Sequence, residues 1–126
     1  MFKEVMISII IVISIIALEF VTQNYTKETV AHTSELLIQL KEQIKRDEGN
    51  ISNDIEEIYN NWEERREKLA YFIEHDELEK VETNLTNIRS FIEVKDLEMA
   101  INSIDEAEFI LNHIKEKNAF NLENIF

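Results

Sequence analysis

Residues 5–18 read VMISIIIVISIIAL, fourteen positions without a charged side chain, and they determine how the rest of the chain is interpreted. Glu19 interrupts this run, and Phe20 and Val21 extend it to residues 5–21. At a rise of about 1.5 Å per residue, a helix over this range is roughly 26 Å long, near the lower limit for crossing the hydrocarbon core of a bilayer. The stretch therefore predicts a membrane-spanning helix.

Three interpretations compete for this segment. A cleaved signal peptide begins with a positive charge, which Lys3 supplies, but it also ends in a small-x-small cleavage site, and Ala17-Leu18-Glu19 does not form one. A buried helix of a soluble protein needs apolar surroundings, which the remaining, more polar sequence does not offer. We therefore expect an uncleaved signal-anchor, that is, a single-pass transmembrane helix.

Charges beside the span indicate its orientation. Lys3 and the α-amino group lie on the short side, whereas Lys27 and the more distant Lys41 are the only basic residues in the twenty positions after Val21. Basic residues near a span are retained on the cytoplasmic side. We expect the protein to lie in the cell membrane with its amino terminus inside and its C-terminal domain extracytoplasmic.

The overall composition excludes several classes of protein. The chain has 126 residues with one glycine, no proline and no cysteine, and 26 acidic against 13 basic residues give a net charge of -13. The absence of cysteine excludes a disulfide scaffold, a zinc ribbon and a thiol enzyme. One glycine cannot supply a phosphate-binding loop or the many tight turns of a β-sandwich. The acidic balance argues against nucleic acid and anionic lipid as partners.

After the predicted anchor (residues 1–21) comes an acidic domain (residues 22–126) with 12 basic and 24 acidic side chains. Its apolar residues recur at steps of three and four, which is typical of helices that bury one stripe. The four stripes are Val30, Thr33, Leu37, Leu40 and Ile44; Ile51, Ile55, Ile58, Trp62, Leu69 and Phe72; Leu78, Val81, Leu85, Ile88 and Ile92; and Leu97, Ala100, Ile104, Ala107, Leu111 and Ile114. We predict an all-α fold, in which an N-terminal single transmembrane helix continues into a small antiparallel helical bundle of three to four helices.

The helix boundaries are less strongly marked. Gly49-Asn50 is the one strong break and predicts the end of the first helix of the bundle. A second break is expected at residues 74–76, although the second and third helices could instead form one long helix. The residues expected to cap the helices after the first are Ser52 or Asn53, Asp76 and Asp96. The tail, residues 118–126, holds four apolar side chains and is expected to dock on the bundle.

Several short motifs resemble a known family. They are the segment from Trp62 to Leu69, the sequence EHDELEKVE at residues 74–82, Asp96 with Ala100, and LENIF at residues 122–126. With the apolar N-terminus and the chain length, they resemble domain of unknown function 4363 over nearly the whole chain. The family comprises small membrane-anchored helical proteins of mostly spore-forming Gram-positive bacteria. The resemblance implies an anchor and a helical domain, and it carries over no activity, ligand or functional residue.

Candidate metal ligands are few. None of the three histidines has a glutamate three positions before it, which is the spacing that a di-iron bundle uses. His75, Glu79 and Glu82 do share one helical face, where they could bind a divalent metal weakly. The alternative is a solvated helix junction, which we expect. We assign no catalytic, cofactor-binding or metal-binding residue.

Other polar and aromatic residues have structural interpretations. Neighbouring acidic residues are expected to form solvated faces, since general acid–base work requires a pocket. These pairs are Glu56-Glu57, Glu63-Glu64, Glu77 with Glu79, and Glu106 with Glu108. His113 is expected near the end of the fourth helix, where a cation suits the helix dipole. Trp62 falls on an apolar stripe and is expected in the core, with a partner-binding hot spot as the alternative.

We interpret the chain as a protein that works by binding. The expected role is an accessory or scaffold subunit that binds another membrane or envelope protein through helix packing, with the anchor raising the local concentration. The alternative is an extracytoplasmic helical bundle that senses a ligand or metal and acts through a partner. We do not expect an enzyme, and a homo-oligomer stays open.

Overall fold

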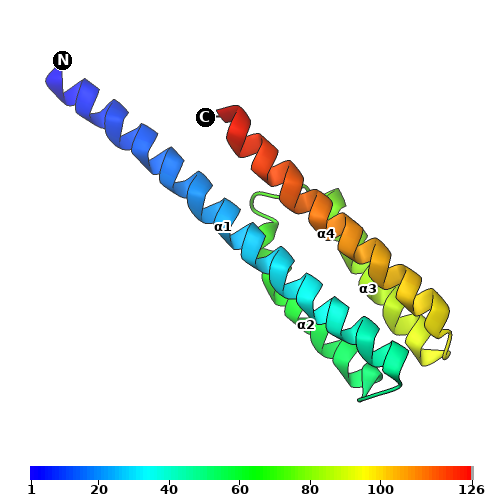
Figure 1. Ribbon diagram of the computed structural model, residues 1–126. Coiled ribbons are helices and arrows are strands. Elements are labelled where there is room, and N and C mark those ends of the chain that lie inside the picture. The colour runs from blue at the N-terminus through cyan, green and yellow to red at the C-terminus, as the bar shows by residue number, and fades with distance from the viewer. Residues whose placement is uncertain (126) are drawn as a thin grey trace.

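The computed structural model describes residues 1–125, with side chains through Ala119. Within this range the chain forms four helices and no strand: α1 (Phe2–Arg46), α2 (Ile51–Leu69), α3 (His75–Glu93) and α4 (Leu97–Ile125). Figure 1 shows an antiparallel bundle from which the N-terminal part of α1 projects. The predicted fold class is confirmed, and the second and third helices of the bundle are separate.

The four helices form a ring around one core. Helix α1 contacts α2 and α4, and α3 contacts the same two helices. The short links make consecutive helices run antiparallel. The predicted stripes meet at the centre, where the buried apolar side chains are Val30, Leu37, Leu40, Ile44, Ile55, Ile58, Trp62, Leu69, Leu78, Val81, Leu85, Ile88, Ile92, Ala100, Ile104, Ala107, Leu111 and Ile114.

Packing of α1 against the bundle begins one turn earlier than its apolar stripe predicts. Thr26, Thr29 and Thr33 are buried together with the aliphatic residues that follow. The Thr26 hydroxyl donates to the Thr22 carbonyl at 2.9 Å. A hydroxyl that bonds to its own helix presents mainly its methyl group to a neighbour. Threonine therefore extends the buried face of α1 toward the projecting segment.

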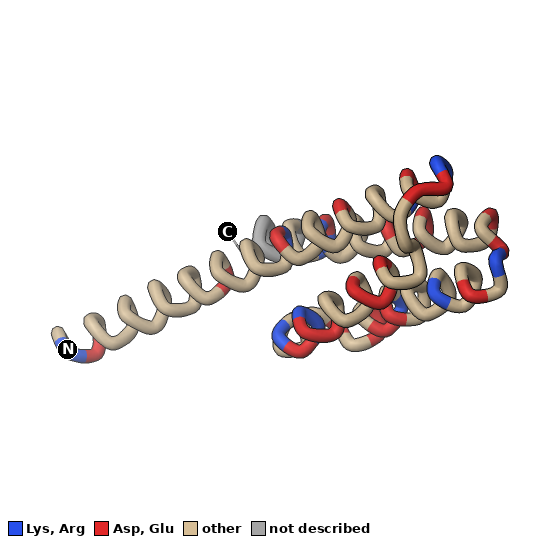
Figure 2. Tube along the Cα trace, turned by 90° about the horizontal axis from the view of Figure 1, so that it is seen from below, with Lys and Arg blue, Asp and Glu red and all other residues tan. Residues whose placement is uncertain are grey.

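The projecting part of α1 is long and apolar enough to cross a membrane, by its length and composition. Its large side chains are exposed, with Ile10 at 58% and Ile13 at 60%. Figure 2 shows this stretch in tan apart from one acidic position, and it is continuous with the bundle. We call residues 5–21 the candidate span. Because α1 is one helix from Phe2 to Arg46, no linker separates the span from the bundle.

The first turn of the bundle differs from the prediction in its cap. Helix α1 ends at Arg46, and Asp47 (φ 54) and Gly49 (φ 74) adopt left-handed backbone conformations before α2. The α2 cap is Asn50, whose side-chain oxygen accepts from the Asn53 backbone N–H at 3.2 Å. The prediction of Ser52 or Asn53 was wrong, because the turn at Gly49 lets α2 begin at Ile51, which places both residues inside the helix.

Of the two caps predicted for α3 and α4, the structure contradicts the first and confirms the second. Helix α3 begins at His75 without a side-chain cap, so the prediction of Asp76 as a cap was wrong. Asp76 instead lies in the first turn, where its charge complements the helix dipole. Asp96 does cap α4, because its side chain accepts from the Met99 backbone N–H at 3.3 Å. The tail was predicted to dock on the bundle through apolar side chains that lie beyond Ala119, outside the described side chains, so this stays a prediction.

Candidate functional site

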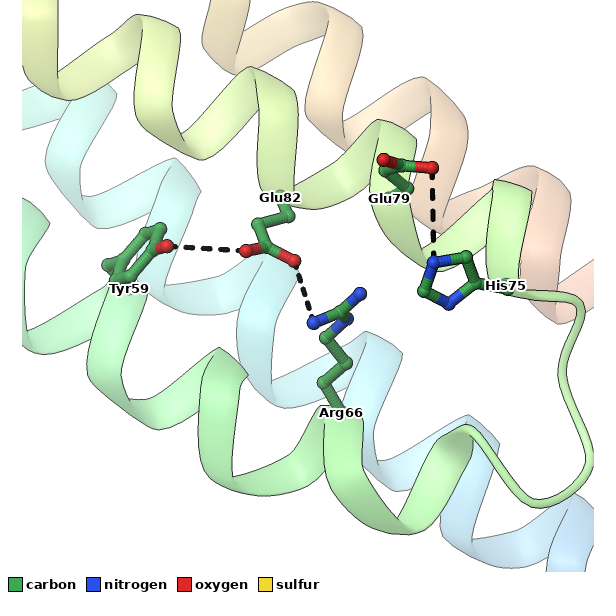
Figure 3. A network of polar contacts seen from close by, with 5 residues as sticks. All are labelled: Tyr59, Arg66, His75, Glu79 and Glu82. Atoms are coloured by element: carbon green, nitrogen blue, oxygen red, sulfur yellow. Dashed lines mark hydrogen bonds and ion pairs between the residues drawn. The ribbon is translucent and has the colours of Figure 1, made fainter.

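A polar cluster lies along the seam between α2 and α3, centred on Glu82 (Figure 3). The Tyr59 hydroxyl is 3.3 Å from Glu82 Oε1, and Arg66 Nη1 is 3.0 Å from Glu82 Oε2. The side chains of Arg66 and Glu82 are each only 25% exposed to solvent. One carboxylate therefore links two side chains of α2, which fixes the position of α3 relative to α2.

Arg89 extends the cluster toward the far end of the bundle. Its guanidinium lies 4.7 Å from the centroid of the Tyr59 ring and 3.5 Å from Glu56 Oε1. Tyr59 is thus held by a cation over its ring and by Glu82 at its hydroxyl. Burial raises the pKa of Tyr59, and the Glu63 and Glu82 charges add to this effect. The phenol is therefore a neutral hydrogen-bond donor at physiological pH.

Glu63 of α2 is the unusual member of this cluster. Its carboxyl lies within hydrogen-bonding reach of Glu82, and its Oε1 atom is buried without a hydrogen-bond partner. Burial raises the pKa of Glu63, and the adjacent Glu82 raises it further, whereas Arg66 acts in the opposite direction. Two ionised carboxylates are both acceptors, so a bond between them needs a proton. We call these two carboxylates the Glu63–Glu82 pair, in which burial favours the protonated form of Glu63.

The predicted line of His75, Glu79 and Glu82 is not brought together as one site. His75 Nε2 lies 4.0 Å from Glu79 Oε2, and both side chains are largely exposed. Figure 3 shows Glu82 turned away from them, toward Tyr59 and Arg66. Over the described residues, no group of three or more histidine, aspartate or glutamate side chains is arranged to hold a metal ion.

The acidic pairs were expected to be solvated. In three of the four pairs, one of the two glutamates is at least partly buried, so the expectation was wrong for that residue. Glu63 has a buried oxygen, Glu77 is only 9% exposed, and Glu108 Oε1 is buried without a hydrogen-bond partner. Burial raises the pKa of Glu108, and the nearby Lys41 partly offsets this shift. These acids lie at the edges of the buried stripes, at the seams between helices.

The sequence predicted structural roles for Trp62 and His113, and the structure confirms the first and contradicts the second. Trp62 is completely buried, as the core interpretation predicts, and its indole Nε1 has no hydrogen-bond partner. The role proposed for His113 was wrong, because α4 continues to Ile125 and His113 is not in the last turns. His113 Nε2 instead lies 3.9 Å from Glu77 Oε1 of α3.

The seam between α1 and α4 carries an apolar patch that sequence reasoning did not single out. Lys41 of α1 pairs with Asp105 of α4 across this seam at 2.5 Å. Ile38 lies three residues before Lys41, and Phe109 lies four residues after Asp105. Since the helices are antiparallel, both side chains lie about one turn nearer the candidate span than the ion pair. Ile38 is 50% exposed and Phe109 is 74% exposed.

We call Ile38 and Phe109 the seam patch. A sequence signal for it exists, since Ile38 and Phe109 are large apolar residues that lie outside the predicted stripes. An apolar residue off the stripe of an amphipathic helix faces outward. The pattern alone does not show that two such residues, far apart in sequence, lie at the same level.

Comparison with known proteins gives one match. Residues 20–125 match the model of a family described as domain of unknown function (DUF4363). No curated protein and no solved structure matches the chain. The matched range contains α2, α3 and α4 completely, together with the part of α1 that packs on them. The resemblance noted from the short motifs is thus confirmed, and the chain belongs to the DUF4363 family.

Proposed function

We propose that this chain is a single-pass membrane protein whose extracytoplasmic bundle acts as an accessory or scaffold subunit for another membrane or envelope protein. The candidate span supports the anchor, because its exposed apolar side chains are stable only in a nonpolar environment. Lys3 on the short side favours a cytoplasmic amino terminus.

The observation that carries the binding role is the seam patch. Phe109 exposes most of an aromatic ring on the outer face of α4, and Ile38 of α1 adds a half-exposed aliphatic side chain at about the same level. Aromatic residues of this kind dominate the binding energy of many interfaces when a partner removes them from water. The Lys41–Asp105 ion pair borders the patch and offers polar groups at its rim.

Site-specific photocrosslinking in native membranes tests this role. A photoreactive phenylalanine analogue at position 109 should give one discrete adduct, which mass spectrometry identifies. Position 102 is the matched control, because Asn102 is also exposed on α4, about two turns farther from the span. We expect the adduct at position 109 and none at position 102. A monomeric protein that forms no adduct at position 109 contradicts the proposed role.

Sensing is the second candidate, and the Glu63–Glu82 pair favours it. A surface hollow of about 290 Å³ reaches Glu82 of this pair, and it is lined by Arg66, Glu79, Glu82, Thr83, Thr86 and Asn87. A divalent cation that binds the two carboxylates should raise the melting temperature of the full chain in detergent. Thermal-shift measurements with Ca²⁺ and Zn²⁺ check this. A shift that persists in Glu63→Gln assigns the cation to another place.

A further inference from the structure

Aromatic side chains from two elements meet at the end of the bundle that faces the candidate span. Tyr25 lies on α1, and Tyr71 and Phe72 lie in the linker between α2 and α3. The rings of Tyr25 and Phe72 pack edge to face with 6.4 Å between their centroids, and Lys68 Nζ lies 5.9 Å from the centroid of Tyr25. These contacts hold the linker at the level of Tyr25, and α4 continues past the linker beside α1 (Figure 1).

The helical rise places this level relative to a bilayer. Tyr25 follows Val21, the last residue of the candidate span, by four positions. In a continuous helix these four residues correspond to about 6 Å, and a tilt of the helix shortens their height above the membrane. The headgroup layer is about 5–7 Å thick on each side of the hydrocarbon core. With the span in the bilayer, the linker therefore lies at the height of the headgroups.

The exposure of the linker suits this position. Tyr71 is 89% exposed, although its neighbour Phe72 packs against the bundle. Tyrosine is enriched at membrane–water interfaces, because its ring is apolar and its hydroxyl is polar. Lys68 adds a flexible cation near the same level, and a lysine can reach the interface with its ammonium group.

The charges of the bundle are distributed along its axis. Arg65 bonds to Thr29, and His113 faces Glu77, so these residues lie in the half of the bundle nearer the span. This half (residues 22–30, 64–80 and 113–125) holds seven basic and nine acidic residues, whereas the far half (residues 31–63 and 81–112) holds five and fifteen. The acidic far half is repelled most strongly by anionic headgroups, so this distribution favours an orientation in which the linker end of the bundle faces the membrane.

We infer that the α2–α3 linker is a second membrane contact, in which Tyr71 inserts among the lipid headgroups beside α1. This inference rests on the proposed function, because it requires that the candidate span crosses the membrane. The linker then adds a contact with the bilayer beside α1, which favours one orientation of the bundle axis. The alternative is that Tyr71 is covered by a partner protein. Vesicles that contain only this chain hold no such partner, so contact with lipid can be measured there by itself.

Fluorescence quenching in phosphatidylcholine vesicles tests the contact, using the full chain. Because the chain has no cysteine, single cysteines can be labelled without a background. The label is placed at Ala70, next to the intact Tyr71, at Val94 in the far linker, and at Ile13 in the candidate span. Lipids that carry a nitroxide near the headgroup quench labels at the interface, and lipids with a nitroxide deep in the acyl chain quench labels in the core.

We expect the shallow nitroxide to quench the Ala70 label about threefold more strongly than the Val94 label. Adding Tyr71→Asp should abolish most of this difference, while the deep quenching of the Ile13 label stays unchanged. Circular dichroism of the variant should match the wild type, since Tyr71 is almost fully exposed.

Two results overturn the inference, and they are distinguishable. If the Ile13 label is quenched but the Ala70 label behaves like the Val94 label, the anchor stands and the linker is free in water. If the Ile13 label is not quenched, the proposed anchor is wrong and the linker contact falls with it.

Discussion

Single buried polar atoms show where this bundle departs from an ideal core. Thr33 Oγ1 and Trp62 Nε1 are buried without hydrogen-bond partners, one on α1 and one on α2. An unsatisfied buried group costs about 1–3 kcal/mol, because its hydration is lost without replacement. These two atoms therefore mark places where the sequence is not optimised for stability.

Thr33→Val should stabilise the protein by about 1 kcal/mol, because a methyl group of the same shape replaces the unpaired hydroxyl. Chemical denaturation of the full chain in detergent measures the free energy of unfolding. Thr29→Val is the matched control, since Thr29 is equally buried but accepts from Arg65 Nη1 at 3.5 Å. The control should be neutral or destabilising. A loss of stability in Thr33→Val means that the hydroxyl has a partner, such as a buried water.

Glu63 predicts a dependence of stability on pH. Its pKa is raised above the ordinary value of 4.5 in the folded protein, so ionisation of Glu63 destabilises the fold. The cost is fully present above the raised pKa and disappears as the pH falls toward 4.5. Glu63→Gln should therefore be more stable than the wild type at pH 7.5, and this gain should vanish at pH 4.5.

Unfolding of both proteins at the two pH values measures this gain, with Glu64→Gln as the control on an exposed neighbouring position. The groups that face Glu63 are Glu82 of α3 together with Arg66 and Glu67 of α2. Equal gains at both pH values exclude titration of Glu63 as the cause.

At the scale of elements, the helix ends show how far sequence patterns reach. The apolar stripes predicted which residues form the core, because a period of three and four leaves no other buried face. The cap at Asp96 was also predictable. Asn50 was missed because it was counted as part of the Gly49-Asn50 break, whereas α2 begins directly after it at Ile51.

Lys95, which follows the end of α3, tests whether a left-handed residue at a helix end lowers the stability of the bundle. It ends α3 with φ 63, and the Asp96 backbone N–H bonds to the Phe91 carbonyl at 2.8 Å, which is the pattern of a Schellman motif. A residue with a Cβ atom pays about 1 kcal/mol in this conformation, whereas glycine does not. Lys95→Gly should stabilise the protein by about 1 kcal/mol, and Lys95→Ala should change little. Denaturation midpoints of the two variants decide, and equal midpoints contradict the assignment.

The polar seams could not be predicted in the same way. Glu63, Glu77 and Glu108 each follow or precede a core residue in sequence, so each lies about 100° around its helix from that core residue. At this angle a side chain is buried only if the neighbouring helix covers it, which depends on the packing of the bundle. The pairing of Glu63 with Glu82, and of Ile38 with Phe109, likewise requires the relative positions of helices that are distant in sequence.

At the scale of the whole molecule, one long helix joins two environments. The part of α1 that packs in the bundle presents buried threonine and aliphatic side chains to its neighbours, and the projecting part exposes apolar side chains on all sides. The overall arrangement was predictable, because an unbroken apolar run and four amphipathic stripes leave few alternatives. Its placement in a cell remains the central proposal.

Labelling of intact cells tests that proposal most directly. Val94 is 72% exposed at the far end of the bundle, and Val94→Cys introduces the only thiol in the chain. With the bundle outside the cytoplasmic membrane, a membrane-impermeant maleimide should label this cysteine in intact cells as fully as in permeabilised cells, and the labelled protein should stay in the membrane fraction after alkaline extraction. Labelling that requires permeabilisation, or release of the labelled protein from the membrane, contradicts the account.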